Sequence, residues 1–141
     1  MRRSLLTLCS VTNTSYARCV SVGVCTDPKV LQSLTRNNYY GNSEFDKFPV
    51  ISVDWYQARQ YCEWRTARLP TEAEWDKAGD GTGNRPEYIW GDVSENKGVW
   101  QIALKDTTEV GVYPENKSVY GAYDMNSNVW EWVNDWYSPT Y

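Results

Sequence analysis

The amino-acid sequence predicts one α+β domain with two short helices, short strands and much irregular structure. Helical spacing of apolar residues is clearest in two stretches between residues 54 and 80, and each stretch follows a capping signal. After residue 81, Gly, Asn and Asp recur between aromatic residues, a pattern typical of short strands joined by turns. A length of 141 residues is enough for one domain with a modest core.

The first part of the chain is less regular. Residues 1–10, "MRRSLLTLCS", predict a first strand or a ragged start, because their apolar run is short for an export signal and far too short to span a membrane. A short helix follows, and Asn13 or Thr14 is its expected cap. Residues 23–48 are rich in Asn, Ser, Asp and Gly and predict a long loop. Loops of this length inside a domain are usually functional or held in place by other residues.

The first clear helix is predicted after residues 50–53, "VISV", which predict a short strand. Asp54 and Gln57 have the spacing of a capping box, in which each side chain accepts a hydrogen bond from the other residue's backbone N–H. The apolar face of this helix is expected to contain Trp55, Ala58 and Cys62.

The second clear helix is predicted by "RLPTEAEW", residues 68–75. Thr71 and Glu74 form another capping box, and Pro70 is placed to pack on Trp75. Gly79 or Gly81 is expected to end the helix. Because so short a helix is marginal alone, its Trp75–Ala78 face must dock on the rest of the domain.

Composition excludes several classes of chemistry. The chain has no histidine, which removes histidine bases, Ser-His-Asp triads and His-ligated zinc. The net charge of −4 and the lack of a basic stripe argue against a nucleic-acid partner. Cys19 and Cys25 lie six positions apart, so either a local disulfide or reduced thiols are consistent with the sequence. Cys62 is expected to be a small buried hydrophobe.

Glu131 poses the main question, because it lies between two tryptophans in "NVWEWVNDWY". Residues 128–137 predict a strand with apolar side chains on both faces, so the carboxylate needs a compensating charge. Asp124, Asn126 and Asn128 precede it and supply the oxygen donors that Ca²⁺ prefers. The residues alone leave two alternatives about even, a calcium ion or a salt bridge to a residue such as Arg68.

Three motifs in order, "RLPTEAEW", "YIWGD" and "YGAYDMNSNVWEWVNDWY", resemble the sulfatase-modifying factor family, whose type member is the formylglycine-generating enzyme. The likeness runs from residue 11 to residue 141, which we take as a partial domain after the ragged segment 1–10. The resemblance implies a C-type-lectin-like fold held together partly by calcium. The motif residues that carry it are Arg68, Thr71, Glu74, Trp75, Trp90, Gly91, Asp92, Asn128, Trp130 and Trp132.

The resemblance also implies metal ligands. One family calcium site matches Asp124, Ser127, Val129 and Glu131, with Ser127 and Val129 acting through their main-chain carbonyls. Ser127 stands where the family commonly has glycine. A second site would fall near Asn96 and Asp106. With this match, calcium becomes the preferred partner of Glu131.

Enzymes of this family oxidise a substrate cysteine of a sulfatase to formylglycine, with molecular oxygen and Cu(I) held by two cysteines. None of Cys9, Cys19, Cys25 and Cys62 matches that pair, so we expect a domain truncated at both ends that is inactive as given. A sulfatase-like peptide or protein would be the partner of a full-length protein, and no membrane span is expected.

Two other functions are kept as alternatives. The first is a non-catalytic, lectin-like module that binds a ligand or regulates, with Tyr39, Tyr40, Trp100 and Tyr113 as candidate exposed aromatics. Core packing is the simpler expectation for each of these rings. The second is an inert remnant with an unpaired sheet edge.

Overall fold

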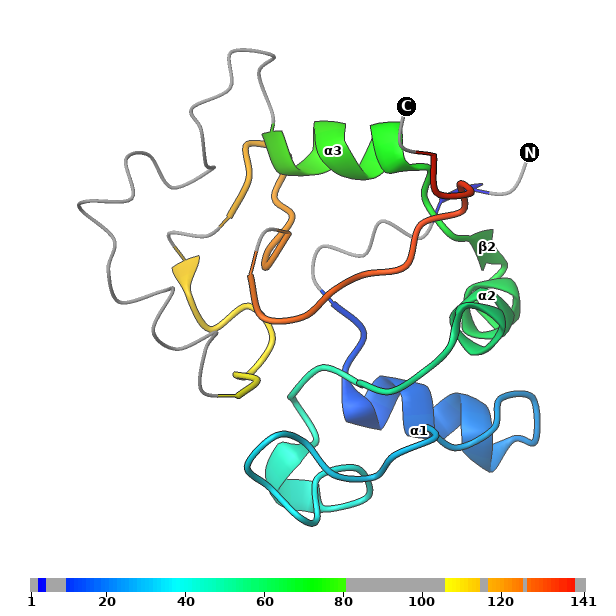
Figure 1. The fold of residues 1–141 in the computed structure, drawn as a ribbon, viewed down its shortest axis with the longest axis vertical. Coiled ribbons are helices and arrows are strands. Elements are labelled where there is room, and N and C mark those ends of the chain that lie inside the picture. The colour runs from blue at the N-terminus through cyan, green and yellow to red at the C-terminus, as the bar shows by residue number, and fades with distance from the viewer. Residues whose placement is uncertain (1–2, 5–9, 81–105, 115–116, 126, 139–141) are drawn as a thin grey trace.

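A computed structural model describes residues 3–4, 10–80, 106–114, 117–125 and 127–138. Within these residues the chain forms three α-helices, one 3₁₀ helix and two very short strands, joined by long irregular connections (Figure 1). The α+β class with much irregular structure is confirmed, but the described part has one helix more than the two expected. The additional helix is the short one anticipated after the ragged start.

Helix α1 spans Asn13–Ser21, so it already includes Asn13 and Thr14, the two residues that were expected to cap it from outside. Thr12 is the N-cap, and its hydroxyl accepts a hydrogen bond from the Ser15 N–H at 3.2 Å. Asn13 instead donates from its side chain to the carbonyl of Phe45 at 2.9 Å, which ties α1 to the 3₁₀ helix η1, Ser43–Phe45. The cap prediction was therefore wrong by one position, because Asn13 binds a distant loop.

Helix α2, Trp55–Trp64, has the predicted capping box, with both hydrogen bonds between Asp54 and Gln57 at 2.9 Å. Its most buried face differs from the expected one. Tyr61 is 5% exposed and stacks on Tyr16 of α1, with ring centroids 5.6 Å apart. The tyrosine pair and a disulfide between Cys19 and Cys25 form one core cluster, which decides the open question about these thiols. Cys62 is free and buried, as predicted.

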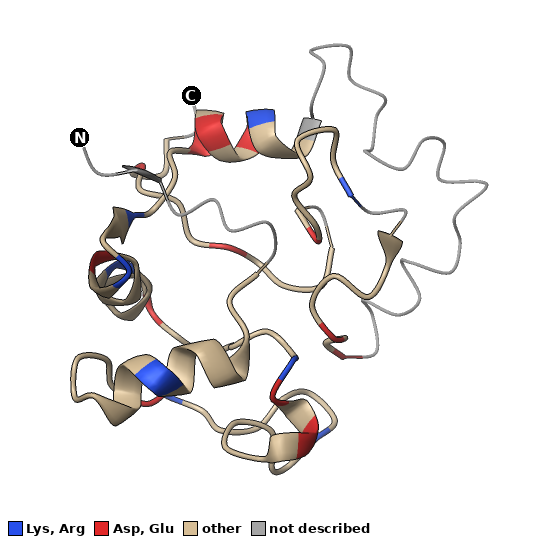
Figure 2. Ribbon diagram, turned by 180° about the vertical axis from the view of Figure 1, so that it is seen from behind, with Lys and Arg blue, Asp and Glu red and all other residues tan. Residues whose placement is uncertain are grey.

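Helix α3, Glu72–Asp80, has the second predicted capping box. The Thr71 N–H donates to Glu74 Oε2 at 2.9 Å, and the Glu74 N–H donates to Thr71 Oγ1 at 3.2 Å. Acidic residues occupy its first turn and a lysine its last turn, which suits the helix dipole (Figure 2). Ala78 packs on Ala122 and Met125 beside Trp75, so the predicted docking face is confirmed. Gly79 lies inside the helix and does not end it.

The sheet content is small. Strand β1, Arg3–Ser4, pairs in parallel with β2, Ala67–Arg68, so residues 1–10 do contain a first strand. The strand predicted at residues 50–53 does not form. Its neighbour Pro49 makes only an isolated bridge to Thr12, and Ser52 has a φ of 59°, which interrupts an extended chain.

The segment 128–137 is also not a regular strand, although it alternates as one would. It passes between α3 and the pair α1 and α2 (Figure 1). From residue 130 onward the exposure alternates, with Trp130 fully exposed and Trp132 49% exposed, while Glu131 and Val133 are partly buried. The expectation of burial on both faces was wrong, because the described residues cover only one side. No described helix has the length and apolar character needed to cross a membrane.

Candidate functional site

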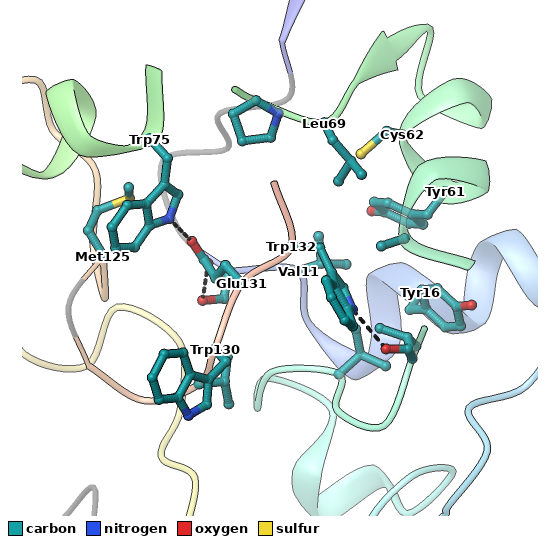
Figure 3. A pocket seen from close by; sticks show the side chains of 16 residues that line it. Val11, Tyr16, Tyr61, Cys62, Leu69, Trp75, Met125, Trp130, Glu131 and Trp132 are labelled. Atoms are coloured by element: carbon teal, nitrogen blue, oxygen red, sulfur yellow. Dashed lines mark hydrogen bonds between the residues drawn. The ribbon is translucent and has the colours of Figure 1, made fainter. Parts of the chain in front are cut away.

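Glu131 lies in an apolar cavity of about 120 Å³ between α1, α2 and α3 (Figure 3). The cavity walls come from segments far apart in the sequence, and they include Tyr16, Tyr61, Cys62, Leu69, Trp75 and Trp132. Among the described lining residues, Glu131 is the only one with a carboxyl side chain, and none is a lysine or an arginine. The site therefore has a carboxyl group in a largely apolar surrounding of aliphatic and aromatic side chains.

Two neutral donors hold the Glu131 carboxylate. The Trp75 indole N–H donates to Oε2 at 2.7 Å, and the Ser10 hydroxyl donates to Oε1 at 2.9 Å (Figure 3). Burial raises the pKa of the Glu131 carboxyl, the charge of Asp124 raises it further, and these two hydrogen bonds oppose the shift. A carboxylate in such a place is stabilised by a cation.

Arg68 is not that cation, and the salt-bridge alternative is wrong for this residue. Its guanidinium binds Glu74 in a bidentate pair, with both N···O distances at 2.7 Å. This pair lowers the pKa of the Glu74 carboxyl to about 2 and raises the pKa of Arg68. The arginine of the "RLPTEAEW" motif thus stabilises the start of α3 and does not pair with Glu131.

The α3 motif and the tryptophan motif form one unit. Besides the Trp75–Glu131 bond, the Asn134 N–H donates to the Pro70 carbonyl at 2.8 Å. The Glu72 N–H donates to Asp135 Oδ2 at 2.6 Å, so a carboxylate also occupies the N-terminal end of α3. Two motifs separated by more than 50 residues are therefore joined at several points along the same segment.

Indole N–H groups also attach this segment to α2. Trp55 Nε1 donates to the Val133 carbonyl at 2.8 Å, and Trp132 Nε1 donates to the Val53 carbonyl at 2.9 Å. Tryptophans here work as hydrogen-bond donors as well as apolar surface. This explains why a segment with no ladder partner among the described residues can be held in place.

Asp124, the second expected metal ligand, is 1% exposed. The Gly111 N–H donates to its Oδ2 at 2.7 Å, and burial still raises the pKa of its carboxyl. Gly111 has a φ of 70°, in the region that favours glycine. Among the described residues, the ion pairs found involve neither Asp124 nor Glu131.

The turn between the two acids has the positive φ angles of an irregular loop, at Asp124 and Asn128. Asn128 exchanges two hydrogen bonds with the backbone of Thr108, at 3.0 and 3.2 Å. The Val129 N–H donates to the Ser127 carbonyl at 2.8 Å, which leaves that oxygen a second lone pair. The carboxylates of Asp124 and Glu131 and the main-chain carbonyls of the residues between them are oxygen donors of the kind that Ca²⁺ prefers.

Asp106, expected near a second metal site, has other partners. Ser33, Thr35 and the Thr107 N–H donate to its oxygens at 2.6–2.9 Å, and Arg36 lies 3.3 Å from Oδ1. Burial would raise the pKa of the Asp106 carboxyl, but these hydrogen bonds outweigh it and lower the pKa to about 2. Its charge is therefore compensated without a metal. Asn96, Trp90, Gly91 and Asp92 lie outside the described residues.

The candidate ligand-binding aromatics are mostly not on the surface. Tyr39 is fully buried, donates to the Pro49 carbonyl at 2.6 Å and accepts from Thr107, so the simpler expectation of core packing holds for it and it is not an exposed ligand-binding ring. Tyr40 and Tyr113 are half-buried, and Trp100 lies outside the described residues. The most exposed rings are instead Tyr56, Trp130, Trp136 and Tyr137. The strand-like alternation of residues 129–133 was the available signal for Trp130 only, because it places this ring on the opposite face from Glu131.

Residues 4–141 match the family model described as "Sulfatase-modifying factor enzyme 1-like domain". The chain belongs to this family. The motif unit built from α3 and the segment 128–137 is therefore a feature of a sulfatase-modifying factor domain, as the resemblance in sequence suggested.

Relatives with different names are similar to this chain. A formylglycine-generating enzyme of Streptomyces coelicolor is 37% identical over 106 residues, which cover 66% of this chain and 34% of that protein. A protein named serine/threonine-protein kinase pkn1, of Chlamydia pneumoniae, is 46% identical over 93 residues, 66% of this chain and 14% of that protein. An inactive C-alpha-formylglycine-generating enzyme 2 of Bos taurus is 40% identical over 102 residues, 64% of this chain and 34% of that protein. The matches span about a third or less of each relative.

Proposed function

We propose that this chain forms the calcium-stabilised scaffold of a formylglycine-generating-enzyme-like domain, with a C-type-lectin-like fold, and that it does not itself oxidise cysteine. The observation that carries the proposal is the state of the cysteines. Cys19 and Cys25 are bonded to each other, and Cys62 is buried, which raises the pKa of its thiol to about 11. Cys9 lies outside the described residues.

Copper does not fit the described cysteines. Cu(I) favours soft thiolate ligands, and the family's reaction needs two of them at one place. A disulfide offers no thiolate, and a single buried thiol with a raised pKa is a poor nucleophile and ligand. We therefore derive no oxidation step from these residues.

The test of inactivity is a peptide assay. A synthetic peptide containing the motif CxPxR is incubated with this chain, oxygen and copper, and formylglycine is measured by mass spectrometry. The Streptomyces coelicolor enzyme serves as the positive control. We expect product only in the control, and any formylglycine formed by this chain would refute the proposal.

The calcium part of the proposal is supported by the carboxylates of Asp124 and Glu131. Asp124 is buried, and its negative charge raises the pKa of the Glu131 carboxyl, so the two like charges repel each other. When bound, calcium would supply the positive charge that both acids need. Asp124, Glu131 and the carbonyls of Ser127 and Val129 are the proposed ligands. After treatment of the protein with a chelator, isothermal titration should show calcium binding, and a thermal melt should show a higher Tm with calcium than without it. A flat titration with no thermal shift would discard the metal.

A non-catalytic binding module is the second candidate, and the exposed rings of Trp130, Trp136 and Tyr137 favour it. Exposed aromatic surface is typical of protein and peptide recognition. The same CxPxR peptide can test this function without turnover. We expect the indole NMR resonances of Trp130 and Trp136 to shift on peptide addition, and their invariance at millimolar peptide would speak against this candidate.

A further inference from the structure

The structure points to a positioning role for two residues outside the proposed ligand set. We infer that Trp75 and Ser10 orient the Glu131 carboxylate for calcium and that the "RLPTEAEW" motif owes part of its function to presenting this indole. The inference rests on the proposed calcium site. It concerns the neutral donors around the ligand and assigns them an effect on metal affinity.

Two hydrogen bonds from distant parts of the chain set the geometry of the Glu131 carboxylate. Trp75 and Ser10 are 56 and 121 positions from Glu131 in the sequence, and each holds a different carboxylate oxygen, at 2.7 and 2.9 Å. Two bonds on two oxygens fix both the position and the rotation of the carboxylate plane. A carboxylate has about four acceptor sites, so two remain for a cation.

The donors on Glu131 leave the charge of its carboxylate available to a cation. Both donors are neutral, so they orient the carboxylate without cancelling its charge. Arg68 would have cancelled the charge, but its guanidinium is committed to Glu74 at 2.7 Å. Hydrogen bonds from outer groups that fix a metal ligand commonly change metal affinity 10- to 100-fold when removed.

Trp75 is itself held in place by the start of α3 and by the cluster on which its ring packs. Its helix begins at the Thr71–Glu74 capping box and the Arg68–Glu74 pair. The indole packs against the cluster of Ala78, Ala122 and Met125. Ala122 and Met125 flank Asp124 in the chain, so the same cluster that fixes the indole also supports the second carboxylate. Trp75 thus donates to Glu131 while its ring packs on residues close to Asp124 in the chain.

Trp55 provides a matched control. Its indole N–H also donates to the segment after Glu131, at 2.8 Å, but to the main-chain carbonyl of Val133. Both residues lie in the first or second turn of a capped helix and are partly buried. Trp55→Phe and Trp75→Phe each remove one indole hydrogen bond and keep an aromatic ring, and only the second removes a bond to the proposed ligand.

The experiment measures the calcium Kd of the wild type, W75F and W55F by isothermal titration, with calcium alone as the probe. We expect W75F to raise the Kd at least tenfold. W55F should stay within about threefold of the wild type, since its lost bond is worth about one ordinary hydrogen bond and lies off the carboxylate. Equal Kd values for W75F and the wild type would overturn the inference and leave the calcium site standing.

A second readout separates orientation from loss of structure. In the wild type, the Trp75 indole N–H resonance, identified by its absence in W75F, should shift on calcium addition, while the Trp55 resonance should not. Ser10→Ala, a smaller change at the other oxygen, should also raise the Kd several-fold, which keeps the inference testable if W75F fails to fold. Failure of the wild type to bind calcium would instead contradict the proposed site itself.

Discussion

At the scale of single residues, three acids in this chain show how surroundings decide what a carboxylate does. Asp106 accepts hydrogen bonds from several donors and has Arg36 beside it, and its pKa falls to about 2. Asp124 and Glu131 are held by fewer donors and by no described cation, and burial raises the pKa of each. The same carboxyl group is thus compensated by an arginine at Asp106, whereas at Asp124 and Glu131 an added cation would stabilise its charged form.

Asp124→Asn tests whether the charge of Asp124 is uncompensated, because the substitution should then change the free energy of unfolding in opposite directions without and with calcium. Without calcium, near neutral pH, the variant should be more stable than the wild type by about 1 kcal/mol, the usual scale of a single substitution, because it removes an uncompensated buried charge. With calcium, the wild type should gain stability and the variant should not. Urea unfolding with and without chelator measures both effects. A calcium-free variant less stable than the wild type would contradict the account of Asp124.

At the scale of elements, the helices depend on their capping residues and on contacts beyond the helix. Each of the three has nine or ten residues, too short for stability in isolation. Capping boxes at Asp54 and Thr71 were readable because two residues at fixed spacing make them. The face that each helix buries was harder to predict. In α2 the residue missed was Tyr61, whose burial depends on stacking against Tyr16 of another helix.

Thr71→Ala should lower the free energy of unfolding by about 1 kcal/mol through loss of the α3 cap. Thr71→Ser is the matched control, because a serine hydroxyl can accept the same hydrogen bond from the Glu74 N–H. Chemical denaturation followed by circular dichroism gives both values. Equal losses for alanine and serine would show that the cap does not account for the stability of α3.

At the scale of the whole molecule, polar links join distant segments of the described residues, whose sheet consists of two strands of two residues each. The long loop 23–48 is held by Asp106 through Ser33 and Thr35, and Arg36 lies over the rings of Phe45 and Phe48, 5.0 Å from each centroid. The other side is held by the bonds between α3 and the segment 128–137. Stability should therefore respond to pH through the acids in these links.

Asp106 carries the clearest pH prediction. Its folded pKa of about 2 lies below the ordinary value of 3.8, so its contribution is present above pH 3.8 and is lost as the pH falls toward 2. Asp106→Asn should cost about 2 kcal/mol at pH 7, and the difference from the wild type should shrink across that window. Thermal melts from pH 2 to 7 measure this, with Asp46→Asn, an exposed acid, as control. A pH-independent difference would contradict this role.

The sequence by itself determined the local features and the family. Capping boxes, buried Cys62 and the order of the motifs depend on residues close together, so spacing alone revealed them. The predicted strands at 50–53 and 128–137 failed for the opposite reason, since a strand exists only where another segment supplies its hydrogen bonds.

Only the tertiary structure decided how the candidate site is built. It paired Cys19 with Cys25, gave Arg68 to Glu74, and brought Trp75 and Ser10 onto Glu131. The sequence named the carboxylate and the arginine but left two partners open for the acid, because charge and residue type do not specify distance. Which donor reaches a carboxylate is set by the packing of segments more than 50 residues apart, and that packing is a property of the folded chain.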